Sequence, residues 1–102
     1  MEQLDRILRM EQILDEATEK MVELDRAVEQ YEAIRGKLQE LAAYYSGPQW
    51  RRDYEDDSAG KFPKDLKRGV LSEDAVYDLL TEHDRLMARL EELARREKAE
   101  KL

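Results

Sequence analysis

Residues 7–45, ILRMEQILDEATEKMVELDRAVEQYEAIRGKLQELAAYY, carry the pattern that decides the fold. Apolar residues recur along this stretch in alternating steps of three and four, and only Arg35 interrupts the run. We call these positions the seam: Ile7, Met10, Leu14, Ala17, Met21, Leu24, Val28, Tyr31, Arg35, Leu38, Ala42 and Tyr45. A repeat sustained over this length is typical of a long helix that packs one apolar face against another helix.

Glycine and proline decide where this first helix ends. The seam keeps its phase across Gly36, so we expect one continuous helix that is bent there or packed closely against another backbone. The sequence Ser46-Gly47-Pro48 breaks helices, which predicts that the first helix occupies residues 1–45. Ser46 with Gln49 three residues later fits a capping box that opens a short second helix ending before Gly60.

Residues 46–71 are predicted to form a short helical connection. After the second helix, Pro63 can begin a further single turn through Leu66, and Gly69 suits a left-handed stop. Ser72 then fits the N-cap of a last helix over residues 72–98.

Two apolar residues strengthen the prediction of that last helix. Leu71 just before the cap and Val76 at the fourth helical position match a hydrophobic staple. The helix continues as an apolar stripe in steps of three and four and ends in basic residues, which suit the negative end of the helix dipole. No strand alternation is present along the chain.

The sequence therefore predicts one all-α domain over residues 1–102. Its long N-terminal helix and its C-terminal helix form an antiparallel, coiled-coil-like hairpin joined by the short aromatic-rich segment. Because the last helix is the shorter one, the N-terminal part of the seam would stay uncovered, and an uncovered apolar seam is typical of an interface. The candidate interface residues are Ile7, Met10, Leu14, Ala17 and Met21. We expect a homodimer through them, or pairing with another helical protein.

Composition limits the classes of partner. The net charge is −7, with acidic and basic residues interleaved, which argues against binding to nucleic acid or to anionic membranes. Acidic mimicry of a nucleic acid, as an inhibitor, is a weaker alternative. There is no cysteine, no segment resembling a signal peptide and no long apolar run. We expect a cytoplasmic protein.

Aromatic residues concentrate between positions 44 and 62, and two interpretations fit them. The first is an aromatic plug where the helices meet, since aromatic side chains dominate core packing. The second is a groove for a peptide or a small ligand. The candidate groove residues are Tyr44, Tyr45, Trp50, Tyr54, Lys67 and Arg68. Basic residues of this segment lie near acidic ones, which favours local charge neutralisation.

The same segment carries a family resemblance. Tyr44-Tyr45, Trp50, the Asp53-Tyr54-Glu55 run and the stretch from Pro63 to Leu80 resemble a family of small bacterial proteins known as domain of unknown function 4298. The Met1-Glu2-Gln3 opening is similar too, so the resemblance covers nearly the whole chain. The turn at residues 46–48 departs from the order of glycine and serine expected there. The resemblance implies a bacterial, cytosolic, all-helical protein, and it implies no activity.

Few residues suggest chemistry. His83, the single histidine, lies on the apolar stripe of the last helix, where a packed histidine is the simpler interpretation. Asp74, Asp78 and Glu82 share a helix face at four-residue spacing, which is typical of a solvated stripe more than of a metal site. We predict no catalytic residue, no cofactor and no metal site, hence a non-enzymatic interaction protein. The alternative is a small-ligand or metal-binding module that uses residues 44–68 and His83.

Overall fold

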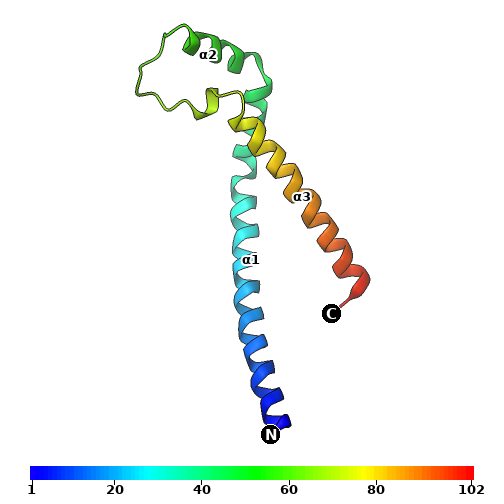
Figure 1. Cartoon of the computed structure of the whole chain (residues 1–102). Coiled ribbons are helices and arrows are strands. Elements are labelled where there is room, and N and C mark those ends of the chain that lie inside the picture. The colour runs from blue at the N-terminus through cyan, green and yellow to red at the C-terminus, as the bar shows by residue number, and fades with distance from the viewer. The chain divides into compact units, whose positions relative to one another are not determined.

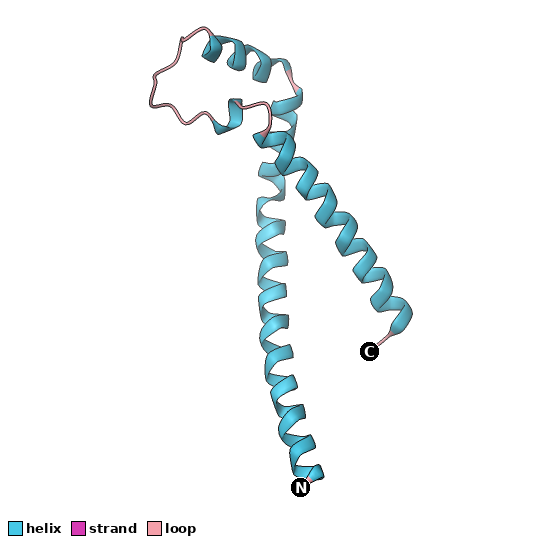
Figure 2. Ribbon diagram, in the orientation of Figure 1, coloured by secondary structure: helices cyan, strands magenta, loops and turns pink.

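The computed structural model describes all residues from 1 to 102 and is all-α (Figure 1). Its elements in order are α1 (Glu2–Ser46), α2 (Pro48–Ser58), the 3-10 turn η1 (Gly69–Leu71) and α3 (Ala75–Glu100). Figure 2 shows helices and loops and no strand. The predicted fold class is confirmed: a long N-terminal helix, a short helical connection and a second long helix.

The chain divides into two units, Met1–Leu38 and Gln39–Leu102. The first unit is a stretch of α1, a helix in which no residue is buried. Glu2 and Asp5 lie in its first turn, where negative charge stabilises the positive end of the helix dipole.

The predicted continuity of α1 across Gly36 is confirmed, since helix runs unbroken to Ser46. A Cβ atom added at Gly36 would meet no atom within 4 Å. Of the two alternatives for this glycine, a bend or a closely packed backbone, the structure shows no other backbone of the chain in close contact.

The junction between α1 and α2 differs from the predicted capping box. Gly47 is the N-cap of α2 and makes no side-chain cap hydrogen bond, while Pro48 occupies the first turn. Proline is favoured there because its φ suits a helix and its missing N–H needs no acceptor. Ser46 instead completes α1, so the prediction that Ser46 opens α2 is wrong. A Cβ at Gly47 would lie 3.2 Å from the carbonyl oxygen of Ala43, which explains the glycine.

The C-terminus of α2 is closed by a Schellman motif. Gly60 has a φ of +77° and donates its N–H to the Asp57 carbonyl at 3.0 Å. The Lys61 N–H reaches the Asp56 carbonyl at 3.1 Å, which completes the motif. The left-handed stop is thus Gly60, and the prediction that placed one at Gly69 is wrong, because Gly69 begins η1.

Residues 59–68 form the loop between α2 and η1 (Figure 2). Residues 63–66 make the predicted single turn, which the Leu66 N–H closes by donating to the Pro63 carbonyl at 3.2 Å.

The residues predicted to begin α3 make the expected contacts, but regular helix begins later than predicted. The Ser72 Oγ accepts a hydrogen bond from the Ala75 N–H at 3.1 Å. A capping serine typically accepts from the N–H three residues later, as here. The two staple residues, Leu71 and Val76, are the buried hydrophobic residues of the chain, at 8% and 3% exposure. Regular helix begins at Ala75 with Asp74 as its N-cap, so the predicted start at residue 72 is early by three residues, although the Ser72 hydrogen bond is present.

Candidate functional site

Three aromatic rings pack together where α1 ends and α2 begins. The ring of Trp50 stacks on that of Tyr54, with centroids 5.2 Å apart and planes inclined by 18°. Tyr45 meets Trp50 edge-on at the same centroid distance and an interplanar angle of 70°. Both geometries are favourable for aromatic pairs. We call Tyr45, Trp50 and Tyr54 the aromatic cluster.

The polar atoms of the aromatic cluster bind the segment that leads into α3. The Trp50 indole N–H donates to the Val70 carbonyl at 2.8 Å. The Tyr45 hydroxyl donates to the Glu73 carbonyl at 3.0 Å, and the Tyr54 hydroxyl donates to the Glu73 carboxylate at 3.1 Å. This last hydrogen bond raises the pKa of Tyr54, since it stabilises the neutral phenol. The aromatic cluster therefore fixes residues 70–73 against α2 and the end of α1, as the plug interpretation predicts.

Tyr44 lies outside this stack and has a different partner. Its hydroxyl donates to the carboxylate of Asp53 in α2 at 2.6 Å, a charge-assisted hydrogen bond. This hydrogen bond, with smaller contributions from partial burial and from the charge of Asp53, raises the pKa of Tyr44 to about 12. Asp53 is thus held by a tyrosine and not by one of the nearby basic residues.

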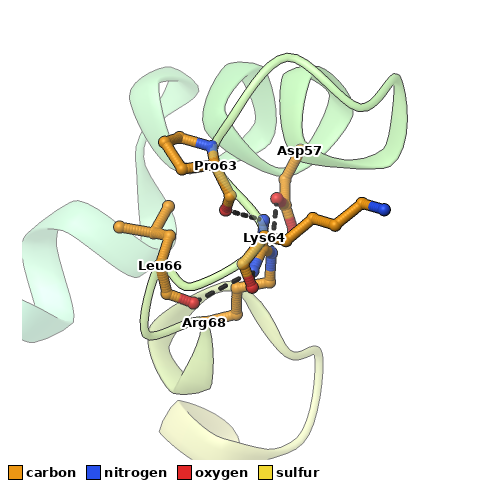
Figure 3. Close-up of polar contacts among 5 residues, drawn as sticks. All are labelled: Asp57, Pro63, Lys64, Leu66 and Arg68. Atoms are coloured by element: carbon orange, nitrogen blue, oxygen red, sulfur yellow. Dashed lines mark hydrogen bonds and ion pairs between the residues drawn. The ribbon is translucent and has the colours of Figure 1, made fainter.

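Arg68 holds the loop between α2 and η1 in place (Figure 3). Its Nε donates to the Asp57 carboxylate at 2.7 Å. The two terminal nitrogens donate to three loop carbonyls: Nη1 to Lys64 at 2.9 Å and Leu66 at 3.0 Å, and Nη2 to Pro63 at 2.5 Å. Figure 3 shows these oxygens turned toward the guanidinium. We call this arrangement the Arg68 clamp.

The structure brings three of the six candidate groove residues together, Tyr45, Trp50 and Tyr54, and places the other three apart from them. Tyr45, Trp50, Tyr54 and Arg68 direct polar atoms at other parts of the chain. Lys67 is exposed. A surface hollow of about 550 Å³ adjoins Tyr44, and its other lining residues are Glu40, Ala43, Gly47, Pro48 and Gln49. It is therefore lined by none of the other five candidates.

Of the candidate metal residues, Asp78, Glu82 and His83 lie on α3, and Asp74 is its N-cap. The carboxylate of Glu82 accepts two hydrogen bonds from Arg85, at 2.6 and 2.9 Å, and this pairing lowers the pKa of Glu82. His83 is half-buried, and its Nδ1 lies 3.1 Å from the Asp84 carboxylate. No group of three histidine, cysteine, aspartate or glutamate side chains is arranged to hold a metal ion.

The candidate interface residues lie on the solvent-facing surface of α1. Ile7, Met10, Leu14 and Met21 are 50%, 51%, 58% and 60% exposed, and Ala17 is exposed as well. No residue of α1 is buried, so no other part of the chain covers these side chains. The structure thus presents these five side chains as one exposed apolar row.

Sequence reasoning missed the Arg68 clamp as a structural unit. The prediction of local charge neutralisation anticipated an acidic neighbour, and the ion pair between Arg68 and Asp57 provides one. The three carbonyl acceptors had no signal in the sequence, because a backbone oxygen becomes an acceptor only through the path of its loop.

Comparison with known proteins adds the family. No helix of the chain is both long enough and apolar enough to cross a membrane. No curated protein and no solved structure matches the chain significantly. Residues 7–93 match the family described as Domain of unknown function (DUF4298), which agrees with the resemblance carried by the aromatic segment. The chain therefore belongs to the DUF4298 family.

Proposed function

We propose that this protein is a non-enzymatic interaction protein that self-associates as a homodimer through Ile7, Met10, Leu14, Ala17 and Met21. The observation that carries the proposal is the exposure of this apolar row on a helix without a buried residue. Apolar surface gathered in one continuous stripe is characteristic of an interaction site, unlike isolated exposed apolar residues.

The energetics of a lone helix support the same conclusion. Helix propensity alone stabilises even a long helix only marginally in water, and most helices in proteins owe their stability to packing of an apolar face. Residues 1–38 hold no such packing within their own unit. Pairing two copies along the row removes apolar surface from water on both helices at once.

A second copy of this chain is the partner that we propose for the row. The spacing of three and four that makes the row continuous also allows two identical helices to interlock their side chains. A helix of another protein with the same spacing is the competing occupant. We place the protein in the cytoplasm, a compartment in which proteins are stable without disulfides, as this cysteine-free chain must be.

The test compares wild type with Leu14→Glu by sedimentation equilibrium. Leu14 is 58% exposed, so pairing would recover roughly half of the ~1.5–3 kcal/mol that full burial of a leucine provides. Two copies lose this contribution, and each helix then carries a carboxylate inside the seam. The expected result is a Kd raised by at least about a hundredfold.

Gln12→Glu is the matched control, because it adds the same charge at a position outside the seam on the same helix. It should keep a dimer of nearly wild-type Kd. Fluorescence of Trp50 should be unchanged in both variants, since the aromatic cluster is built from residues 45–54. A wild-type monomer at high micromolar concentration would overturn the proposal. If both substitutions raised the Kd of the dimer equally, the seam would not be the interface.

A further inference from the structure

The charged residues beside the seam are sorted by side. With Ile7 taken as heptad position a, the e positions are Leu4, Glu11, Thr18 and Asp25, and the g positions are Arg6, Ile13, Lys20 and Ala27. Every charged residue at e is therefore an acid, and every charged residue at g is a base. In coiled coils these two positions flank the interface and determine partner orientation.

We infer that the second copy docks parallel and in register, with Arg6 facing Glu11 of the second copy and Lys20 facing its Asp25. This inference rests on the proposed homodimer and adds its orientation. In a parallel pair each g residue faces the e residue five positions later on the partner helix. By symmetry each of the two contacts occurs twice, so the dimer contains oppositely charged pairs and no like-charged ones at these positions.

The antiparallel arrangement offers no such pairs. There, e positions face e positions and g positions face g positions. Because Glu11 and Asp25 share one side and Arg6 and Lys20 share the other, no antiparallel register brings an acid opposite a base. Charge complementarity thus favours the parallel orientation over an antiparallel pair in any register.

The charged side chains are available for these contacts. Arg6, Glu11 and Asp25 form no ion pair within the chain. Lys20 lies 3.2 Å from Glu23 on its own helix, but both side chains are more than half exposed. An exposed pair of this kind is weak and exchanges readily, so it does not prevent Lys20 from reaching across.

Arg35 sets the C-terminal limit of the paired region. It occupies position a, and in a parallel dimer it would face the same cation of the second copy. We therefore assign the interface to Ile7 through Val28, about three heptads.

Disulfide cross-linking tests the orientation, since the chain has no cysteine of its own. In a parallel in-register dimer, Met10→Cys lies opposite itself, within reach of a disulfide. In the antiparallel pair that overlaps Ile7 to Leu24 most fully, Met10 lies opposite Met21. The expected result is rapid self-cross-linking of Met10→Cys. The control Arg9→Cys, on the outer face of the same helix, should cross-link slowly.

The outcomes separate the two proposals. Cross-linking only when Met10→Cys and Met21→Cys are mixed would overturn the parallel orientation and leave the dimer in place. A wild-type chain that sediments as a monomer would overturn the dimer itself.

If Met10→Cys folds poorly, charge reversal supplies a second measurement. Glu11→Lys should raise the Kd of the dimer by about two- to thirtyfold, because it removes two exposed ion pairs from the dimer. Arg6→Glu combined with Glu11→Lys should restore it, and failure to restore it would contradict the assigned pair.

Discussion

Replacing Arg68 with lysine should destabilise the C-terminal unit although the charge is kept. The guanidinium serves four acceptors at once: the Asp57 carboxylate and the carbonyls of Pro63, Lys64 and Leu66. A lysine ammonium is a compact group without this planar fork, so it reaches Asp57 or part of the loop but not the whole set.

The magnitude follows from the hydrogen bonds that lysine cannot replace. The Arg68 side chain is 34% exposed and that of Asp57 is 18% exposed, so water replaces part of what the substitution removes. At ~0.5–1.5 kcal/mol net for each hydrogen bond, the removal of two or three of them lowers the free energy of unfolding by about 1–4 kcal/mol. Arg68→Ala removes all four hydrogen bonds and should lie at the upper end.

Urea unfolding followed by fluorescence of Trp50 measures this destabilisation. Trp50 is the only tryptophan, and its indole N–H binds the Val70 carbonyl just beyond the Arg68 clamp, so its emission reports on this unit. Lys67→Ala is the control: it removes the neighbouring exposed cation and should change the free energy of unfolding by less than about 0.5 kcal/mol. If Arg68→Lys unfolds at the same urea concentration as wild type, the clamp does not stabilise this loop.

Three further predictions concern Tyr44, Gly36 and Gly60. The pKa of Tyr44 is raised to about 12, so its contribution to stability is complete below the ordinary tyrosine value near 10 and is lost as pH rises toward 12. In Tyr44→Phe, the free energy of unfolding in urea should no longer fall between pH 10 and pH 12 because of this group. An identical pH dependence in Tyr44→Phe and in wild type would refute the role of the Tyr44 hydrogen bond. Gly36→Ala should stabilise α1 by about 0.5–1 kcal/mol, because the site is helical and no atom lies within 4 Å of the added Cβ. Gly60→Ala should destabilise α2 by about 1–2 kcal/mol, because the φ of Gly60 is +77°. If both glycine substitutions changed the free energy of unfolding in urea in the same direction, these two predictions would be contradicted.

Signals that act over a few residues or repeat along the chain were predictable from sequence. The seam predicted a helix that the structure extends by a single residue beyond Tyr45. Ser72, Leu71 and Val76 predicted the entry to α3, because a cap and its staple depend only on local spacing.

Competing local signals were harder to rank. Ser46, Gly47 and Pro48 each suit a helix junction, and only the structure shows that Pro48 opens α2 while Ser46 finishes α1. Gly60 and Gly69 are both compatible with a left-handed stop, and which one adopts it depends on where the preceding helix ends.

The candidate site depended on contacts between distant residues. Tyr45 and Glu73 are hydrogen-bonded across 28 positions, and Trp50 and Val70 across 20. Periodicity carries no information about such pairs, so the sequence left the plug and the groove open as alternatives. The hydrogen bonds of the aromatic cluster favour the plug, and they leave the exposed row on α1 as the surface to examine for a partner.

Hydrogen exchange as a function of protein concentration tests the central claim most directly. If two copies pair along Ile7 to Val28, the backbone amides of that region should exchange more slowly as the concentration rises from low to high micromolar. Amides of α2 and η1 should show no such dependence. Exchange in residues 7–28 that is fast and independent of concentration, or protection that grows only in residues 39–102, would contradict self-association through the seam.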